Sequence, residues 1–297
     1  MERELARHGY VVRYGTSESF EQLLRSPASF SATDGVVIGY ADKLQCAKLY
    51  PAVQSLVKRW RPRRIPVVTF SEPPPGKLSR AISIVCRGNI ATVWARTLAR
   101  FLFEKKLTNA VLFHDQRRGV PRSLAANLKL LPEMRHLDAS ARLRVVVKAP
   151  AFVQDPSALL NRFLEFDGAS DIPRVLTKYE RISLDTMRRE VTVVADMAEA
   201  YEAVLDAGVW IFSRDDDAVA ALAFLERKGV AVPSDLSIIA LENSAHYLRF
   251  GLSTCVEDWE TIGYLMAHAI IGDFTVAKTT KGFVRPAAVV LQRSTTP

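Results

Sequence analysis

Two groups of residues have types and spacing that could do chemistry. Asp215, Asp216 and Asp217 form the densest acidic cluster of the chain, and carboxylate oxygens are the ligands that Mg²⁺ prefers. The cluster also precedes an amphipathic run that begins near Ala218, and carboxylates stabilise the positive N-terminal end of a helix. We therefore favour helix capping, with Asp215 as the capping residue, over a magnesium site.

The second group is His114 and Asp115, which end a predicted strand and could act as an acid–base couple. No nucleophile motif accompanies them, since G-x-S-x-G is absent. The sequence also lacks G-x-G-x-x-G, a Walker-A loop and H-E-x-x-H. An α/β enzyme that uses His114/Asp115 or the Asp215–Asp217 cluster is only an alternative, and we expect a protein without catalytic activity.

Cysteine and histidine patterns predict neither a disulfide framework nor a metal site. The cysteines are far apart and odd in number, and no two histidines are four residues apart. We expect no cofactor and no metal. The residues concerned are Cys46, Cys86 and Cys255, and His8, His114, His136, His246 and His268.

Short runs rich in Val and Ile alternate with amphipathic runs along most of the chain. This alternation predicts parallel sheets joined by right-handed helical crossovers. The predicted strands contain Val11-Val12, Val36–Ile38, Ile65–Phe70, Ile82–Val85, Ala110–Phe113, Leu143–Val147, Val191–Val194, Val209–Phe212, Leu236–Leu241 and Ala287–Leu291. The predicted helices are Phe20–Arg25, Leu44–Trp60, Ile90–Lys105, Arg122–Leu131, Ser157–Phe166, Met197–Leu205, Ala218–Lys228 and Thr261–Ile271. With 297 residues, the chain has room for two such doubly wound lobes.

The charge is divided unevenly along the chain. Residues 1–150 hold 26 Lys+Arg and 11 Asp+Glu, or +15, and residues 151–297 hold 14 and 21, or −7. A basic half suggests that one side faces a polyanion, although solvated helix faces explain the split equally well. No run is apolar enough for a membrane span, and the first residues carry no signal-peptide pattern, so we expect a cytoplasmic protein.

The most informative segment is Val209–Gly263. A strand, a polar turn and a helix to Lys228 are followed by Gly229-Val230-Ala231-Val232-Pro233-Ser234-Asp235-Leu236-Ser237. Gly229 stands where a helix end favours a left-handed residue, and Pro233 prevents the chain from re-entering a helix. The next buried strand begins near Leu236.

This pattern resembles the sensor domain of the lactose-repressor (LacI/GalR) family of transcription regulators. Their pattern is an Asp before a helix with an early Ala, then G-x-x-V-P-x-D-hydrophobic-S-hydrophobic. Other similar features are Leu252-Ser253-Thr254, Gly263, the closing Arg293-Ser294-Thr295, Gly9-Tyr10 and Asp34-Gly35-Val36-Val37-Ile38. The resemblance covers nearly the whole chain.

The resemblance implies a periplasmic-binding-protein-like type I fold. Two α/β lobes with doubly wound parallel sheets are joined by three crossing strands, and a small ligand binds in the cleft between them. We place lobe one at 1–112 plus 255–278, and lobe two at 113–254 plus 279–297.

The resemblance also implies effector-binding positions. Arg122 matches the arginine that grips the effector, Asp215 the conserved acid, and Glu242 the position of an acid that binds sugar hydroxyls. The Ala240-Leu241-Glu242 sequence departs from the usual Gly-hydrophobic-Asp, so the ligand class could differ from the common neutral sugar. The remaining matches are Arg214 beside Asp215, Glu257 and Trp259 in a crossover, and Tyr40 and Asn89 in cleft-facing loops.

Family members begin with a helix-turn-helix and a hinge, followed by the first strand of the sensor. Here Met1 falls inside the helix that should follow that strand, so we expect lobe one to lack its first strand and the chain to be a fragment or to have a misassigned start. DNA would then be bound only through an N-terminal head that is absent from this chain.

The function implied is effector sensing: a small molecule, a sugar or a related metabolite, modulates operator binding by a homodimer, with no membrane partner. A free-standing solute-binding protein of the same fold is the alternative.

Overall fold

The computed structural model describes residues 1–12, 35–38, 66–71, 82–86, 90–114, 127–148, 189–273, 283–284 and 288–297. Its helices are α1 (Glu2–Arg7), α4 (Ile90–Glu104), α6 (Leu130–Leu137), α10 (Met197–Glu202), α11 (Asp215–Arg227), the 3₁₀ helix η4 (Ala245–Phe250) and α12 (Trp259–Ile271). Its strands are β1 (Val36–Ile38), β2 (Val67–Ser71), β3 (Ile82–Cys86), β4 (Asn109–His114), β5 (Arg142–Lys148), β6 (Val191–Val194), β7 (Val209–Phe212), β8 (Ser237–Ala240), β9 (Ser253–Glu257), β10 (Phe283–Val284) and β11 (Ala288–Leu291).

The chain divides into two compact units, each made of segments that are distant in sequence. The first unit is Met1–Ile90 with Glu257–Ala287, and the second is Ala91–Val256 with Ala288–Pro297. The bounds predicted from the sequence differ from these, since they put residues 91–112 in the first lobe. These residues lie in the second unit because β4 is hydrogen-bonded between β5 and β7.

The second unit is built on a seven-stranded sheet in the order β11-β9-β8-β7-β4-β5-β6. Every pairing from β9 to β6 is parallel, as the alternation of strands and helices predicts. The four residues of β7 and of β8 are all buried, which explains why these strands, apart from Ser237, are apolar runs rather than alternating ones.

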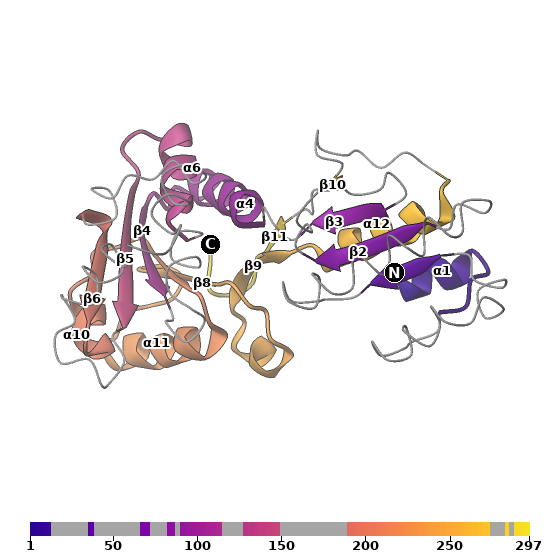
Figure 1. Cartoon of the computed structure of the whole chain (residues 1–297). Helices are drawn as coiled ribbons and strands as arrows, with labels where there is room; N and C mark the ends of the chain where they lie inside the picture. Colours follow the sequence, from indigo (N-terminus) through magenta and orange to yellow (C-terminus); the bar gives the residue numbers. More distant parts are fainter. Residues whose placement is uncertain are drawn as a thin grey trace. The chain divides into compact units, whose positions relative to one another are not determined.

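Helices cover both faces of this larger sheet: α4 and α6 lie on one face, and α10 and α11 on the other (Figure 1). On the α10–α11 face, Tyr201 and Phe224 from the helices pack with Phe113, Trp210 and Phe212 from the strands. The Phe113 and Phe212 rings stack with centroids 4.7 Å apart. The second unit is therefore doubly wound, and the core on this face is formed by side chains between Val111 and Leu252.

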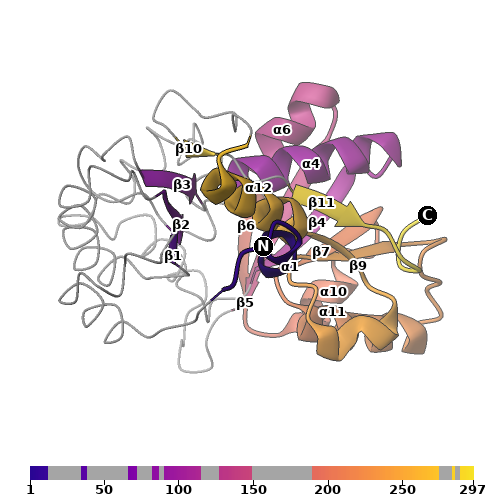
Figure 2. The ribbon, with the colours of Figure 1, turned by 90° about the vertical axis from the view of Figure 1, so that its right-hand side faces the viewer.

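The first unit contains the parallel sheet β1-β2-β3-β10, and its described helices are α1 and α12. Leu5 of α1 and Ile262, Met266 and Ile270 of α12 share a core with Val68 of β2. Figure 2 shows α1 beside α12. The prediction of parallel α/β sheets is thus confirmed for both units.

Most predicted elements that lie in the described residues are confirmed, but one strand is wrong. Residues 10–12 form no strand, and the side chain of Val11 is 86% exposed. Two β-branched residues predicted a strand here, yet the described residues supply no strand to pair with them. The structure also adds β9 and β10, which the sequence pattern did not reveal. The predicted helices Phe20–Arg25, Leu44–Trp60 and Ser157–Phe166, and most of Arg122–Leu131, lie outside the described residues.

Among the described residues, no helix combines the length and the apolar character needed to cross a membrane.

Candidate ligand site at the carboxyl edge of the larger sheet

Polar side chains follow the two neighbouring strands β7 and β8. Arg214 and Asp215 come just after β7, and Glu242 and Asn243 just after β8. The two strands are parallel and in register from Val209 opposite Ser237 onward, so these residues meet at one edge of the sheet. The crevice at the carboxyl ends of the strands is where open α/β sheets bind ligands.

Asp215 is the centre of this edge. Its side chain is only 1% exposed, and its Oδ2 accepts a hydrogen bond of 2.6 Å from the backbone N–H of Ser244. Its own backbone N–H donates to Oε2 of Glu242 at 3.3 Å. Burial raises the pKa of the Asp215 carboxyl, the hydrogen bond from Ser244 lowers it, and the nearby Glu242 raises it further, with a net pKa above the ordinary value.

The second carboxylate oxygen of Asp215 makes this residue a candidate for ligand binding. Oδ1 is buried, and no group in the described part of the chain donates a hydrogen bond to it. A buried carboxylate oxygen without a donor costs free energy, and a ligand hydroxyl that donated to it would recover that cost.

The three consecutive acids do not converge on one point, which argues against the magnesium site. Arg214 holds Asp216 with two hydrogen bonds, from Nε to Oδ1 at 2.8 Å and from Nη2 to Oδ2 at 2.6 Å. Asp216 Oδ1 also accepts from the backbone N–H of Asp217 at 3.0 Å, while Asp215 turns toward Ser244. The capping role predicted for Asp215 is wrong. The N-cap is Arg214, whose side chain makes no cap bond, and Asp215 is the first helical residue.

Glu242 and Asn243 lie in the turn that leaves β8. Asn243 adopts a left-handed backbone with φ of 60°, a conformation that asparagine tolerates better than most residues. Its Oδ1 accepts from Arg293 Nη2 at 2.7 Å, and Arg293 Nη1 donates to the Leu252 carbonyl at 2.5 Å. Arg293 therefore links the side chain of Asn243, the neighbour of Glu242, to the backbone of Leu252.

The motif residues near the C-terminus bind one another. Thr295 Oγ1 accepts from the Ser253 N–H at 2.8 Å and donates to the Ile238 carbonyl at 2.7 Å. The backbone N–H of Arg293 donates to Ser253 Oγ at 2.8 Å. The Leu252-Ser253-Thr254 and Arg293-Ser294-Thr295 patterns thus join β8 and β9 to the C-terminal segment.

The Gly229–Ser237 segment is a structural connection between α11 and β8. Gly229 has φ of 71°, and the N–H of Val230 donates to the Leu225 carbonyl at 3.0 Å, so the predicted left-handed helix end is confirmed. Asp235 Oδ2 accepts from the Ala231 N–H at 2.9 Å, which closes the turn around Pro233.

His114 ends β4 on the same edge, and its side chain is 4% exposed. Its Nδ1 lies 2.8 Å from Nδ2 of Asn127, an amide donor, which assigns Nδ1 as the acceptor. Asp115, the proposed partner, lies outside the described residues. Burial raises the pKa of the Cys255 thiol to about 12, so this thiol is not activated as a nucleophile.

The remaining predicted site residues lie either in the first unit or outside the described residues. Glu257 and Trp259 belong to the first unit, where the side chain of Trp259, at the start of α12, is 53% exposed. Arg122, Tyr40 and Asn89 lie outside the described residues. Sequence reasoning gave Asn243 and Arg293 no role at this edge. The Arg-Ser-Thr ending marked Arg293 as part of the family pattern. It did not reveal the hydrogen-bond partners of Arg293, which are forty residues or more away in the sequence.

The opposite edge of the larger sheet also has a polar hollow. It is lined by Asn109, Arg135, Arg142, Arg144, Glu190 and Asp206. Arg144 pairs with Asp206 at 2.7 Å and Arg135 with Glu190 at 3.4 Å. Both acids of this hollow and two of its three arginines are already engaged in ion pairs, so it is a weaker candidate than the carboxyl edge.

Comparison with known proteins agrees with the fold. Residues 174–296 match the family model of the periplasmic binding protein-like domain, which includes Asp215, Glu242 and Arg293. The predicted periplasmic-binding-protein-like type I fold is confirmed. No curated protein matches the chain.

Several solved structures resemble the whole chain at low identity. A PurR family transcriptional regulator from Vibrio parahaemolyticus is 16% identical with a TM-score of 0.45, and covers 100% of this chain and 91% of its own. A periplasmic binding protein/LacI transcriptional regulator from Alkaliphilus metalliredigens, complexed with D-xylulofuranose, is 14% identical with a TM-score of 0.46 and the same coverage. A LacI family regulator from Silicibacter pomeroyi is 17% identical with a TM-score of 0.47, and covers 99% and 91%. At such identities and TM-scores, none of these likenesses indicates a function for this chain.

Proposed function

We propose that this chain, whose residues 174–296 carry a periplasmic binding protein-like domain, is the effector-sensing part of a LacI/GalR-type transcription regulator. It binds a small polar metabolite at the carboxyl edge of the larger sheet and catalyses no reaction. The chain acts as a homodimer in the cytoplasm, and the bound metabolite changes operator binding.

The observation that supports this proposal best is the buried Asp215 carboxylate at the end of β7. Its Oδ2 is held by the Ser244 N–H, while Oδ1 has no donor among the described residues. Glu242 lies beside it as a second acceptor. Two adjacent carboxylates accept hydrogen bonds from hydroxyl or amine groups, so they suit a sugar or a related polyhydroxylated metabolite.

The remaining predicted contacts complete this proposal. Arg122 supplies a guanidinium that suits paired hydroxyls or a carboxylate, and Trp259 supplies an indole face for a sugar ring. Arg214, Glu257, Tyr40 and Asn89 are proposed as further effector contacts. Because Arg214 already pairs with Asp216 at 2.6 Å, we expect it to position the acids more than to bind a charged ligand.

Sensing requires that the effector bind one conformation of the chain more tightly than another. The effector then shifts the population toward that conformation, and in a dimeric regulator the shift alters how DNA is bound. The size of the response is limited by the difference between the two affinities.

A thermal-shift screen with sugars, sugar phosphates and nucleobases tests the proposal. We expect one compound class to raise the melting temperature in a concentration-dependent way, since a ligand that binds only the folded state stabilises it. Asp215→Asn and Arg122→Ala should reduce the shift, while Asp217→Asn, the same substitution on the same helical turn, should keep it. No shift with any compound, or a shift that survives both Asp215→Asn and Arg122→Ala, would contradict the proposal.

A further inference from the structure

Helix α1 lies directly against α12 in the first unit. Leu5 of α1 is buried in the same core as Ile262 and Met266 of α12. The close approach depends on Gly263, because a Cβ at this position would lie 2.7 Å from the backbone nitrogen of Met1. The packing therefore holds one face of α1 against one face of α12.

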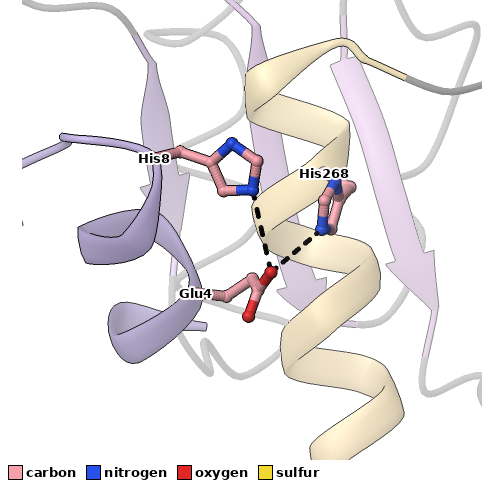
Figure 3. A group of neighbouring side chains, drawn as sticks. All are labelled: Glu4, His8 and His268. Carbon is pink, nitrogen blue, oxygen red and sulfur yellow. Dashed lines mark ion pairs between the residues drawn. The ribbon is translucent and has the colours of Figure 1, made fainter.

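This packing brings three metal-ligating side chains to one point (Figure 3). Glu4 and His8 come from α1 and the residue that ends it, and His268 comes from the last turn of α12. His268 Nε2 lies 3.4 Å and His8 Nε2 3.8 Å from the same oxygen, Oε1 of Glu4. Ligand atoms of all three residues lie within 4.8 Å of one another, and no other group of three such residues does so in the described part of the chain.

These distances suit ligands around a metal ion. Zinc binds nitrogen and oxygen at about 2.0–2.1 Å in tetrahedral geometry, which places two ligand atoms about 3.4 Å apart. Direct hydrogen bonds between nitrogen and oxygen are shorter, with a usual distance of about 2.9 Å. Glu4 Oε1 is therefore well placed for sharing an ion with the two histidines.

Neighbouring side chains orient the proposed ligands. His268 Nδ1 lies 2.7 and 2.9 Å from the two carboxylate oxygens of Asp273. Because a carboxylate only accepts, Nδ1 donates to Asp273, and this bond turns Nε2 of the ring toward Glu4. Arg7 donates to the other oxygen of Glu4, Oε2, at 3.0 Å. A carboxylate behind a ligating histidine is a common arrangement in metal sites.

We propose that Glu4, His8 and His268 bind a divalent transition-metal ion such as Zn²⁺, with Asp273 as a positioning residue. Two imidazoles favour zinc, copper, nickel or iron over Mg²⁺ and Ca²⁺. Three protein ligands leave a fourth position for water or an exogenous ligand. The site is reachable from solvent through His8, whose side chain is 38% exposed, whereas that of His268 is 6% exposed. The bound ion would link α1 to α12.

Zinc titration of the untagged, chelator-treated full chain tests the site. By calorimetry we expect one Zn²⁺ per chain and a melting temperature that rises with zinc concentration. Cobalt should give the visible absorption of a tetrahedral site. His8→Ala changes a partly exposed residue, and Glu4→Gln is a near-isosteric change. Each should reduce zinc affinity at least tenfold. Asp273→Asn should reduce it about 10- to 100-fold.

His136→Ala is the matched control, because His136 is an exposed histidine in the second unit. It should keep the affinity and stoichiometry of the wild type. His268→Ala should abolish binding, and a folded far-ultraviolet circular dichroism spectrum must accompany that result. If the wild type binds no zinc, or if His8→Ala and Glu4→Gln both bind it as tightly as the wild type, the proposal is overturned. Because these measurements use no effector, they are independent of the proposed sensing function.

Discussion

Asp215 is a carboxyl group in a place that disfavours its charge. It is almost fully buried, and Glu242 adds a second negative group beside it, while the backbone N–H of Ser244 donates to its Oδ2. In an unliganded protein such an arrangement costs stability, and proteins often keep this cost at binding sites. We therefore expect Asp215 to change how the free energy of unfolding depends on pH.

We predict that Asp215→Asn makes the protein more stable at neutral pH. The pKa of Asp215 is raised on folding by burial, so the folded state binds more protons than the unfolded state between the ordinary value near 4 and the folded value. The free energy of unfolding then falls as pH rises through that interval. Urea denaturation at several pH values should show a smaller fall for Asp215→Asn than for the wild type. An identical pH dependence in both proteins would refute the prediction.

The acids of the site could be predicted from the sequence, whereas their supports could not. The family resemblance proposed Asp215 and Glu242 as site residues, and the parallel neighbours β7 and β8 bring them to one edge. Asn243 lies in a turn where its own φ is positive, and it accepts a hydrogen bond from Arg293, which is fifty residues further along the chain. A sequence read locally contains no signal for either. The sequence analysis did not identify the Glu4, His8 and His268 group, because His268 reaches the other two only through the packing of α12 against α1.

At the scale of elements, the connection from α11 to β8 follows ordinary local rules. Helix α11 ends at Arg227, Lys228 caps it, and Gly229 reverses the chain with φ of 71°. A Cβ at Gly229 would meet no atom within 4 Å. Any substitution there is consequently penalised by backbone conformation alone and not by crowding.

Gly229→Ala should lower the free energy of unfolding by about 1–2 kcal/mol, the cost of placing an L-residue in the left-handed region. Gly229→Asn should cost less, because asparagine tolerates that region better. Chemical denaturation of the two variants measures the difference. Equal losses in both would show that the backbone conformation is not the cause.

Strand prediction succeeded or failed according to burial. Strands β7 and β8 are buried on both faces, so their apolar runs are continuous and easily recognised. The Val11-Val12 pair looked similar but is too short to indicate burial, and Val11 is largely exposed. Strand β9 was missed because its Ser253-Thr254 start is polar, and those hydroxyls are buried only because Thr296 and Arg293 bond to them.

At the scale of the molecule, residues at the end of the sequence complete a sheet that begins far earlier. Thr295 is 3% exposed, and its hydroxyl accepts from Ser253 while donating to the Ile238 carbonyl. One side chain thus joins β8, β9 and the C-terminal segment. Without it, a buried donor and a buried acceptor both lose their partner.

Thr295→Val should reduce the free energy of unfolding by about 2–4 kcal/mol, since each unsatisfied buried group costs about 1–3 kcal/mol. Thr295→Ser keeps the hydroxyl and should lose far less. Thermal or urea unfolding of both variants provides the comparison. A valine variant as stable as the serine variant would mean that water or another group replaces the lost bonds.

The interleaving of the two units has a consequence for the order in which the chain can fold during synthesis. Residues 288–297 belong to the second unit, yet a ribosome makes them only after Glu257–Ala287 of the first. The larger sheet therefore waits for its edge strand β11 until the whole of the smaller unit has been made. During that interval the N–H and C=O groups of β9 that face β11 lack their strand partner, and a nascent chain exposes a sheet edge that chaperones or a second nascent copy can bind.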